Sequence, residues 1–119
     1  MAKATGVGGL FFRAKDPKSL AAWYEEHLGI SPAPSDMSSP PWTTEAGVSV
    51  VAPFPSDTDY FRADRVFMIN FRVDDLEELI TQLRDSGIEV RNDQSVDGLG
   101  RFAHIEDPEG NPIELWQPA

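Results

Sequence analysis

Short apolar runs alternate with two amphipathic segments along the chain, which predicts a mixed α+β fold. Residues 7–14 (VGGLFFRA) form an apolar run with two aromatic residues, as strands often do. Asp16 and Pro17 suit the N-cap and the first turn of a helix, and large apolar side chains then recur at helical spacing as far as Gly29. The first half therefore predicts a strand followed by a helix that ends at a glycine.

The second half repeats this order. Residues 65–73 (RVFMINFRV) predict a strand, and Asp74 with Glu77 three positions later resembles a capping box at the start of a helix. An apolar stripe follows, and Gly87 ends the helical pattern about 58 positions after the glycine that ends the first one. A repeat of this period indicates two similar units that pack together.

Each half continues in β-like runs after its helix. The remaining predicted strands are 42–46 and 48–54 in the first half, and 88–92, 101–106 and 111–116 in the second. We therefore expect one domain over residues 1–119, an α+β fold of two tandem βαβββ modules at 5–54 and 65–118 with a linker over 55–64.

The stretch FAHIEDPEGNPIELW (102–116) predicts a β-hairpin around the turn residues DPEGN. Alternation along its two strands places His104 and Glu114 on one face with Phe102 and Trp116. If the turn spans DPEGN, His104 lies opposite Glu114 and Phe102 lies opposite Trp116. The first pair could be an acid and its base, two metal ligands, or a cross-strand hydrogen bond that organises the hairpin.

The amino-acid composition disfavours some classes of binding partner. The 119 residues include 10 basic and 20 acidic side chains, so the formal charge is −10, which disfavours nucleic acid and anionic membranes. The absence of cysteine excludes disulfides and thiolate-based sites. Because the N-terminus lacks a secretory h-region and no apolar run could span a bilayer, we expect a cytoplasmic protein.

Three stretches carry a resemblance to a known superfamily. They are GLFFRAKDPKSLAAWYEEHLGI (9–30), INFRVDDLEELITQLRDSGIEV (69–90) and GRFAHIEDPEGNPIELW (100–116). They resemble the vicinal oxygen chelate superfamily, the glyoxalase, bleomycin-resistance and extradiol-dioxygenase group. The resemblance implies a curved mixed sheet around a cleft, with the helices on the outer face. It leaves the activity open, because function varies widely within one fold.

Metal-dependent members of this superfamily use four ligands, from the first and last strands of each module. The resemblance maps these positions onto Gly9, Ser49, Met68 and Glu114. Of these, Glu114 is the residue of a usual ligand type, since glycine has no side chain and a thioether suits hard divalent ions poorly. The resemblance therefore implies that the standard metal site is absent, and an atypical divalent-metal site at His104 and Glu114 stays open.

The resemblance and the strand alternation together assign a set of residues to the cleft. We expect these residues to contact a ligand: Phe11, Arg13, Met68, Asn70, Arg72, Phe102 and Trp116. The two arginines could clamp an anion or pair with the acidic surface. The aromatic residues, with Trp42, could stack on a flat ligand or pack the core.

These observations support three hypotheses about function. The first is a glyoxalase-like protein that lacks the standard metal and sequesters or transforms a small molecule in its cleft. The second is a metal-dependent lyase, isomerase or dioxygenase with the atypical site at His104 and Glu114. The third is a bleomycin-type resistance protein that binds a cationic drug between two chains. The resemblance also implies a homodimer, since clefts of this kind are often completed across chains.

Overall fold

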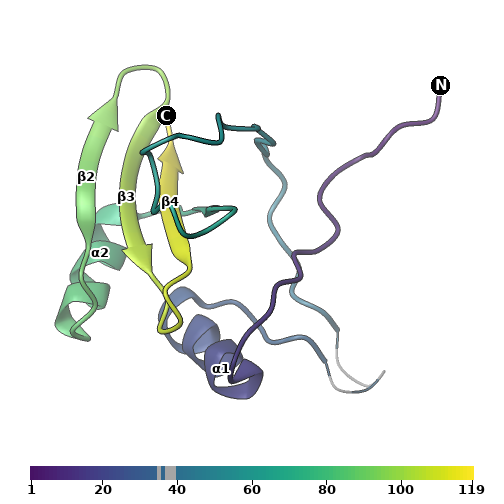
Figure 1. Ribbon diagram of the computed structural model, residues 1–119, viewed down its shortest axis with the longest axis horizontal. Coiled ribbons are helices and arrows are strands. Elements are labelled where there is room, and N and C mark those ends of the chain that lie inside the picture. The colour runs from purple at the N-terminus through teal and green to yellow at the C-terminus, as the bar shows by residue number, and fades with distance from the viewer. Residues whose placement is uncertain (35, 37–39) are drawn as a thin grey trace. The chain divides into compact units, whose positions relative to one another are not determined.

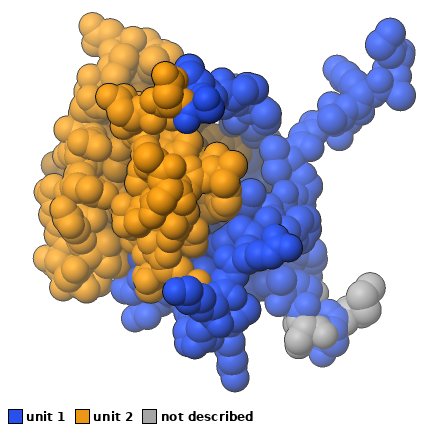
Figure 2. Space-filling view, in the orientation of Figure 1, with its two compact units in different colours: residues 1–56 blue, residues 57–119 orange. Residues whose placement is uncertain are grey.

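The computed structural model describes residues 1–34, 36 and 40–119. It divides into two compact units, Met1–Ser56 and Asp57–Ala119, which are distinguished by colour in Figure 2. No helix among the described residues is long and apolar enough to cross a bilayer.

Among its described residues the first unit has helix α1 (Pro17–Leu28) at the predicted position. A side-chain oxygen of Asp16 accepts a hydrogen bond from the backbone N–H of Ser19, and Pro17 follows the cap. Gly29 ends the helix with a φ of 70°, a left-handed conformation that glycine adopts without strain. Both ends of this helix are therefore as the sequence predicts.

The strands predicted in the first half are not formed. Residues 7–14, 42–46 and 48–54 contain no strand in the structure, so the first βαβββ module is not confirmed. A strand exists through its hydrogen-bond ladder with a neighbour, and apolar content alone does not supply one. Their apolar side chains are mostly exposed, which agrees with the absence of a packed sheet there.

The second unit has the predicted βαβββ order and forms a mixed four-stranded sheet (Figure 1). Its elements are β1 (Ile69–Arg72), α2 (Leu76–Asp85), β2 (Arg91–Val96), β3 (Gly100–Glu106) and β4 (Pro112–Pro118). The strand order is β1-β4-β3-β2. β1 runs parallel to β4, and the other neighbouring strands are antiparallel. The α+β class predicted from the sequence is confirmed.

The N-cap of helix α2 lies one residue later than predicted. Asp75, and not Asp74, accepts from the backbone N–H of Glu78 at 3.0 Å. Inside the first turn the backbone N–H of Leu76 donates to the side-chain oxygen of Gln117 at 2.8 Å, which ties the helix to β4. The buried residues of the helix and sheet form one apolar core: Leu76, Ile80, Leu83, Ala103, Ile105, Ile113 and Leu115.

The hairpin of β3 and β4 has the predicted register. His104 pairs with Glu114 and Phe102 pairs with Trp116. The intervening turn is closed by Asp107, whose carboxylate accepts from the backbone N–H groups of Glu109 and Asn111 and from the side-chain amide of Asn111. Because the turn is locked by side-chain hydrogen bonds, the register cannot slip without breaking them.

Candidate functional site

Glu114 lies at the centre of a hydrogen-bonded network in the second unit. The hydroxyl of Tyr60 donates to its Oε2 at 2.5 Å, and Nε2 of His104 lies 2.8 Å from the same oxygen. The side-chain amide of Asn70 donates to Oε1 at 2.8 Å. Only 6% of Glu114 is exposed, so these contacts replace the water that an exposed carboxylate would bind.

The hydrogen-bond network determines the ionisation state of the Glu114 carboxylate. Burial by itself would raise the pKa of Glu114, but hydrogen bonds from His104, Tyr60 and Asn70 favour the ionised form and hold that pKa below its ordinary value. The pKa of Tyr60 is raised to about 12, first by burial and then by its hydrogen bond to Glu114 and by the charge of that carboxylate. At neutral pH the site therefore holds a carboxylate and a neutral phenol.

His104 has hydrogen-bond partners at both ring nitrogens. Nε2 faces Glu114, and the side-chain nitrogen of Asn92 lies 2.9 Å from Nδ1. An amide N–H can only donate, so Nδ1 accepts and the ring proton lies on Nε2. The side chain of His104 is 11% exposed. Nδ1 is thus already engaged by Asn92, and a role as general base requires Asn92 to move away.

Asn92 reaches the imidazole because β2 contains a bulge. Arg91 pairs with His104 and Gln94 pairs with Phe102, so two residues of β2 lie opposite one residue of β3. Asn92 has a φ of 55°, the left-handed region that asparagine tolerates better than most residues. The bulge thereby turns the side chain of Asn92 toward His104.

β2 also differs from the strand predicted over 88–92. It starts at Arg91 and extends to Val96, and all six of its residues are exposed. It is an edge strand of the sheet, and its polar sequence carries no alternation of apolar residues.

Arg101 on β3 donates two hydrogen bonds of 2.9 Å to the carboxylate of Asp93, and these lower the pKa of Asp93.

Tyr60 belongs to residues 57–68, a segment without helix or strand that precedes β1, and part of it was predicted as a linker. Arg62 donates to the carbonyl oxygen of Gly110 at 3.1 Å, and Arg65 donates to the carbonyl oxygen of Glu109 at 2.9 Å. Two arginines thus attach the segment to the hairpin turn. This attachment brings Tyr60 to the same face of the sheet as Glu114.

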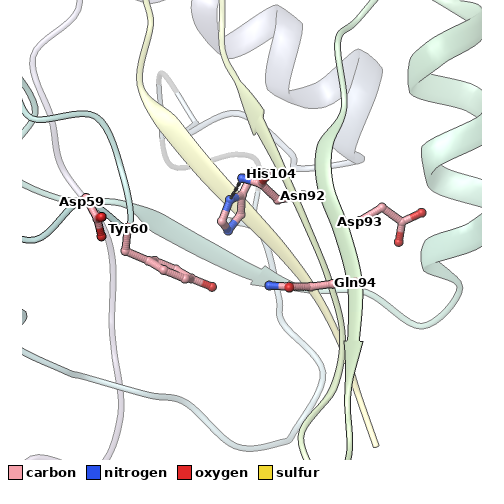
Figure 3. Close-up of a pocket in the computed structure, with 6 residues that line it drawn as sticks. All are labelled: Asp59, Tyr60, Asn92, Asp93, Gln94 and His104. Carbon is pink, nitrogen blue, oxygen red and sulfur yellow. Dashed lines mark hydrogen bonds between the residues drawn. The ribbon is translucent and has the colours of Figure 1, made fainter.

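A shallow, open pocket of about 320 Å³ lies beside the network (Figure 3). It is lined by Asp59, Tyr60, Asn92, Asp93, Gln94 and His104. In Figure 3 the side chains of Tyr60 and Gln94 point toward each other, the imidazole of His104 lies above the gap between them in this view, and Asp93 points away. The rings of Tyr60 and His104 meet edge to face, with centroids 5.2 Å apart. The pocket therefore offers hydrogen-bonding groups and one aromatic wall.

The structure brings some of the predicted cleft residues together. His104, Glu114 and Asn70 meet in the network, and the rings of Phe102 and Trp116 are stacked with centroids 6.0 Å apart. The indole N–H of Trp116 donates to the carbonyl oxygen of Leu99, so the indole is fixed in place.

Other predicted residues are not joined to this network by any contact described above. Arg72 is exposed on β1, and Met68 is half-buried just before that strand. Phe11, which is 93% exposed, Arg13 and Trp42 belong to the first unit, where their roles in binding stay predictions.

The donor set does not fit the divalent metal of the superfamily. Among the described residues there is no group of three or more His, Cys, Asp or Glu side chains that could hold a metal ion. At the mapped positions, Gly9 and Met68 supply no hard donor, and both oxygens of Glu114 already accept hydrogen bonds. Nε2 of His104 carries a proton directed at Glu114, so an atypical metal there would have to break this contact.

Sequence reasoning missed Tyr60, Asn92 and Gln94. Tyr60 lies in a polar stretch far from the hairpin in sequence, and Asn92 and Gln94 lie in an edge strand without a hydrophobic pattern. The useful signal is Asn92 followed by Asp93 within a strand, because both residue types are rare in strands and favour bulges or turns.

Comparisons with known proteins agree with the fold. The family model of the glyoxalase-like domain matches residues 9–116. Lactoylglutathione lyase from Agrobacterium tumefaciens has a similar structure, with a TM-score of 0.63 and 16% identity over 98% of this chain and 96% of that chain. The fold of the glyoxalase and bleomycin-resistance group, which the sequence resemblance implied, is confirmed.

TnmS3, an antibiotic binding protein from Streptomyces sp. CB03234, is 25% identical over 88% of each chain, with a TM-score of 0.56. A glyoxalase/bleomycin resistance protein from the same strain is 30% identical, but the match covers only 44% of this chain and 46% of that chain, with a TM-score of 0.40. No curated protein matches the sequence.

Proposed function

Since the chain belongs to the glyoxalase-like domain family of the vicinal oxygen chelate superfamily, we propose that it binds a small organic molecule without using the superfamily's metal. One observation carries this proposal. The glutamate at a mapped metal-ligand position is instead a carboxylate whose two oxygens accept from Tyr60, Asn70 and His104. A carboxylate held in this way is suited to orienting a polar group and poorly suited to coordinating a metal.

The chemistry of the network supports binding more than turnover. His104 is buried and has a partner at each nitrogen, so it lacks the free lone pair that a general base needs. The ligand would lie in the pocket beside Tyr60, where Gln94 supplies an exposed amide. Phe102 and Trp116 form a stacked pair on β3 and β4, the strands that carry His104 and Glu114, and this pair would stiffen that face.

The similarity to an antibiotic binding protein supports a more specific form of the proposal. That protein is 25% identical to this chain over 88% of its length. We infer that the ligands of this chain include antibiotics or molecules of similar size, which the protein sequesters. We also propose that the protein is a homodimer with a ligand site shared between its two chains. Size-exclusion chromatography with light scattering tests this, because a strictly monomeric protein cannot have a shared site.

The test is a ligand screen of the metal-stripped protein in the presence of a chelator. The melting temperature is measured with a panel of aromatic antibiotics, simple aromatic compounds and the glutathione–methylglyoxal adduct. We expect at least one compound to stabilise the protein without being consumed. Gln94→Ala should weaken that binding, and Gln82→Ala, an exposed glutamine on α2, should leave it unchanged.

Metal-dependent turnover of the adduct or of a catechol would overturn the proposal in favour of an enzyme. If no compound raises the melting temperature and no metal supports turnover, the proposed binding function is wrong.

A further inference from the structure

Tyr60 differs from the other donors to Glu114 in the kind of element that carries it. Asn70 lies on β1 and His104 lies on β3, both within the sheet, whereas Tyr60 lies in the segment 57–68 without helix or strand. Tyr60 is 39% exposed, and the carboxylate that it contacts is 6% exposed. The phenol ring therefore closes the solvent side of a site whose inner side is built from strands.

Departure of the Tyr60 ring from Glu114 would leave the two arginine contacts of its segment in place. Arg62 and Arg65 attach residues 57–68 to the hairpin turn through carbonyl oxygens, and the phenol takes no part in these contacts. After departure of the ring, Glu114 keeps its hydrogen bonds with Asn70 and His104. Oε2 then keeps His104 as a donor, and the acceptor position on Oε2 that Tyr60 had filled becomes open to another donor.

We propose that Tyr60 occupies the place of a ligand, and that the protein binds a neutral hydroxyaromatic molecule whose phenolic O–H donates to Oε2 of Glu114 once Tyr60 has left. This inference rests on the proposed binding function and names the ligand class of the same site. The ligand would make the contacts that Tyr60 makes now. The Tyr60 hydroxyl donates to Glu114, and its ring lies edge to face with the imidazole of His104 at an interplanar angle of 85°.

The surroundings select against anions. Asp59 and Asp93 line the adjoining pocket, Glu114 is ionised, and the guanidinium of Arg101 is already held by Asp93. A carboxylate or phosphate would therefore meet like charges. A neutral phenol avoids this repulsion, and the pocket of about 320 Å³ beside Tyr60 provides room for a small aromatic ring system.

The experiment compares wild type, Tyr60→Ala and Tyr60→Phe with three probes of similar shape. These are p-cresol, toluene, which lacks the hydroxyl, and p-toluate, which is an anion. Tyr60→Ala should bind p-cresol at least about tenfold more tightly than toluene or p-toluate, since a hydrogen bond to a carboxylate is worth this much. Wild type should bind p-cresol about tenfold more weakly than Tyr60→Ala, because its own phenol competes. Tyr60→Phe keeps the ring but lacks the hydroxyl, so its affinity should lie between these two.

A second measurement uses wild type alone, so the test survives if a variant does not fold. The chain has two tyrosines, and the ring resonances of Tyr60 are identified by their nuclear Overhauser contacts with the imidazole of His104, which meets the phenol edge to face. Saturation with p-cresol should move these resonances toward those of a solvent-exposed tyrosine.

Equal affinity for p-cresol and toluene, or bound p-cresol with an unmoved Tyr60 ring, would overturn the inference. Binding of other classes of compound without movement of Tyr60 would overturn the inference and leave the proposed function intact. A protein that binds no organic compound at all would overturn both.

Discussion

The side-chain amide of Asn92 lies 2.9 Å from Nδ1 of His104, and Asn92 adopts a φ of 55° at the bulge that directs it there. Two effects can therefore be separated by substitution. Asn92→Gly keeps the left-handed backbone and loses the hydrogen bond, which we expect to lower the free energy of unfolding by about 1 kcal/mol. Asn92→Ala loses the bond and strains the backbone, so the loss should be about 2–3 kcal/mol. Urea unfolding measures both, and equal losses would show that the backbone at residue 92 is unstrained.

The same contact determines which nitrogen of His104 carries the proton. Long-range proton–nitrogen NMR spectra of wild type should show the ring proton on Nε2 and none on Nδ1, because Asn92 donates to Nδ1. In Asn92→Asp a carboxylate faces Nδ1 and can only accept, so Nδ1 should no longer be held without a proton. A wild-type ring that is already protonated at Nδ1 would contradict the network.

Ionisation of Glu114 links the network to acid stability. Its folded-state pKa is below the ordinary value of 4.5, so the carboxylate stabilises the fold above that value, and the contribution is lost as pH falls through the folded-state pKa. Glu114→Gln should lower the free energy of unfolding by about 1–3 kcal/mol at neutral pH and flatten its decline between about pH 5 and pH 3.

Glu89→Gln is the matched control, because the Glu89 side chain is 79% exposed. It should keep the wild-type pH profile. A Glu114→Gln variant whose stability declines with acid as steeply as that of wild type would show that Glu114 is not held ionised by its partners.

Tyr60 should ionise late in an alkaline titration. Its pKa of about 12 exceeds the ordinary value of 10.0, so its contribution to stability is complete below about pH 10 and is lost as pH rises through about 12. The absorbance of tyrosinate near 295 nm follows this step, and the chain has only Tyr24 and Tyr60 to report. Tyr60→Phe should remove the late step, and its persistence in that variant would assign it to Tyr24.

The sequence predicted the parts of the molecule that are determined by local chemistry. The DPEGN turn and the alternation on each side of it determined the register of His104 with Glu114, because a slip by one residue would turn Ile105 and Ile113 out of the core. Both helices could also be predicted, since an Asp cap and an apolar stripe act within a few residues.

Contacts that depend on distant or irregular backbone could not be predicted in this way. Tyr60 reaches Glu114 across 54 positions of sequence, and its orientation depends on Arg62 and Arg65 binding the hairpin turn. Asn92 reaches His104 through a bulge, which breaks the alternation used to assign faces. The first-half strands were predicted from apolar content, which does not specify a pairing partner.

The most direct test of the central claim, that Glu114 is held by protein hydrogen bonds and not by a metal, is calorimetric titration of the metal-stripped protein with Zn²⁺, Ni²⁺, Mn²⁺ and Fe²⁺. His104→Ala and Glu114→Ala are titrated beside wild type. The network predicts no specific binding to wild type, because the oxygens of Glu114 and Nε2 of His104 are engaged with one another and with Tyr60 and Asn70. Micromolar or tighter binding to wild type that is lost in both variants would contradict the claim and establish a metal centre at His104 and Glu114.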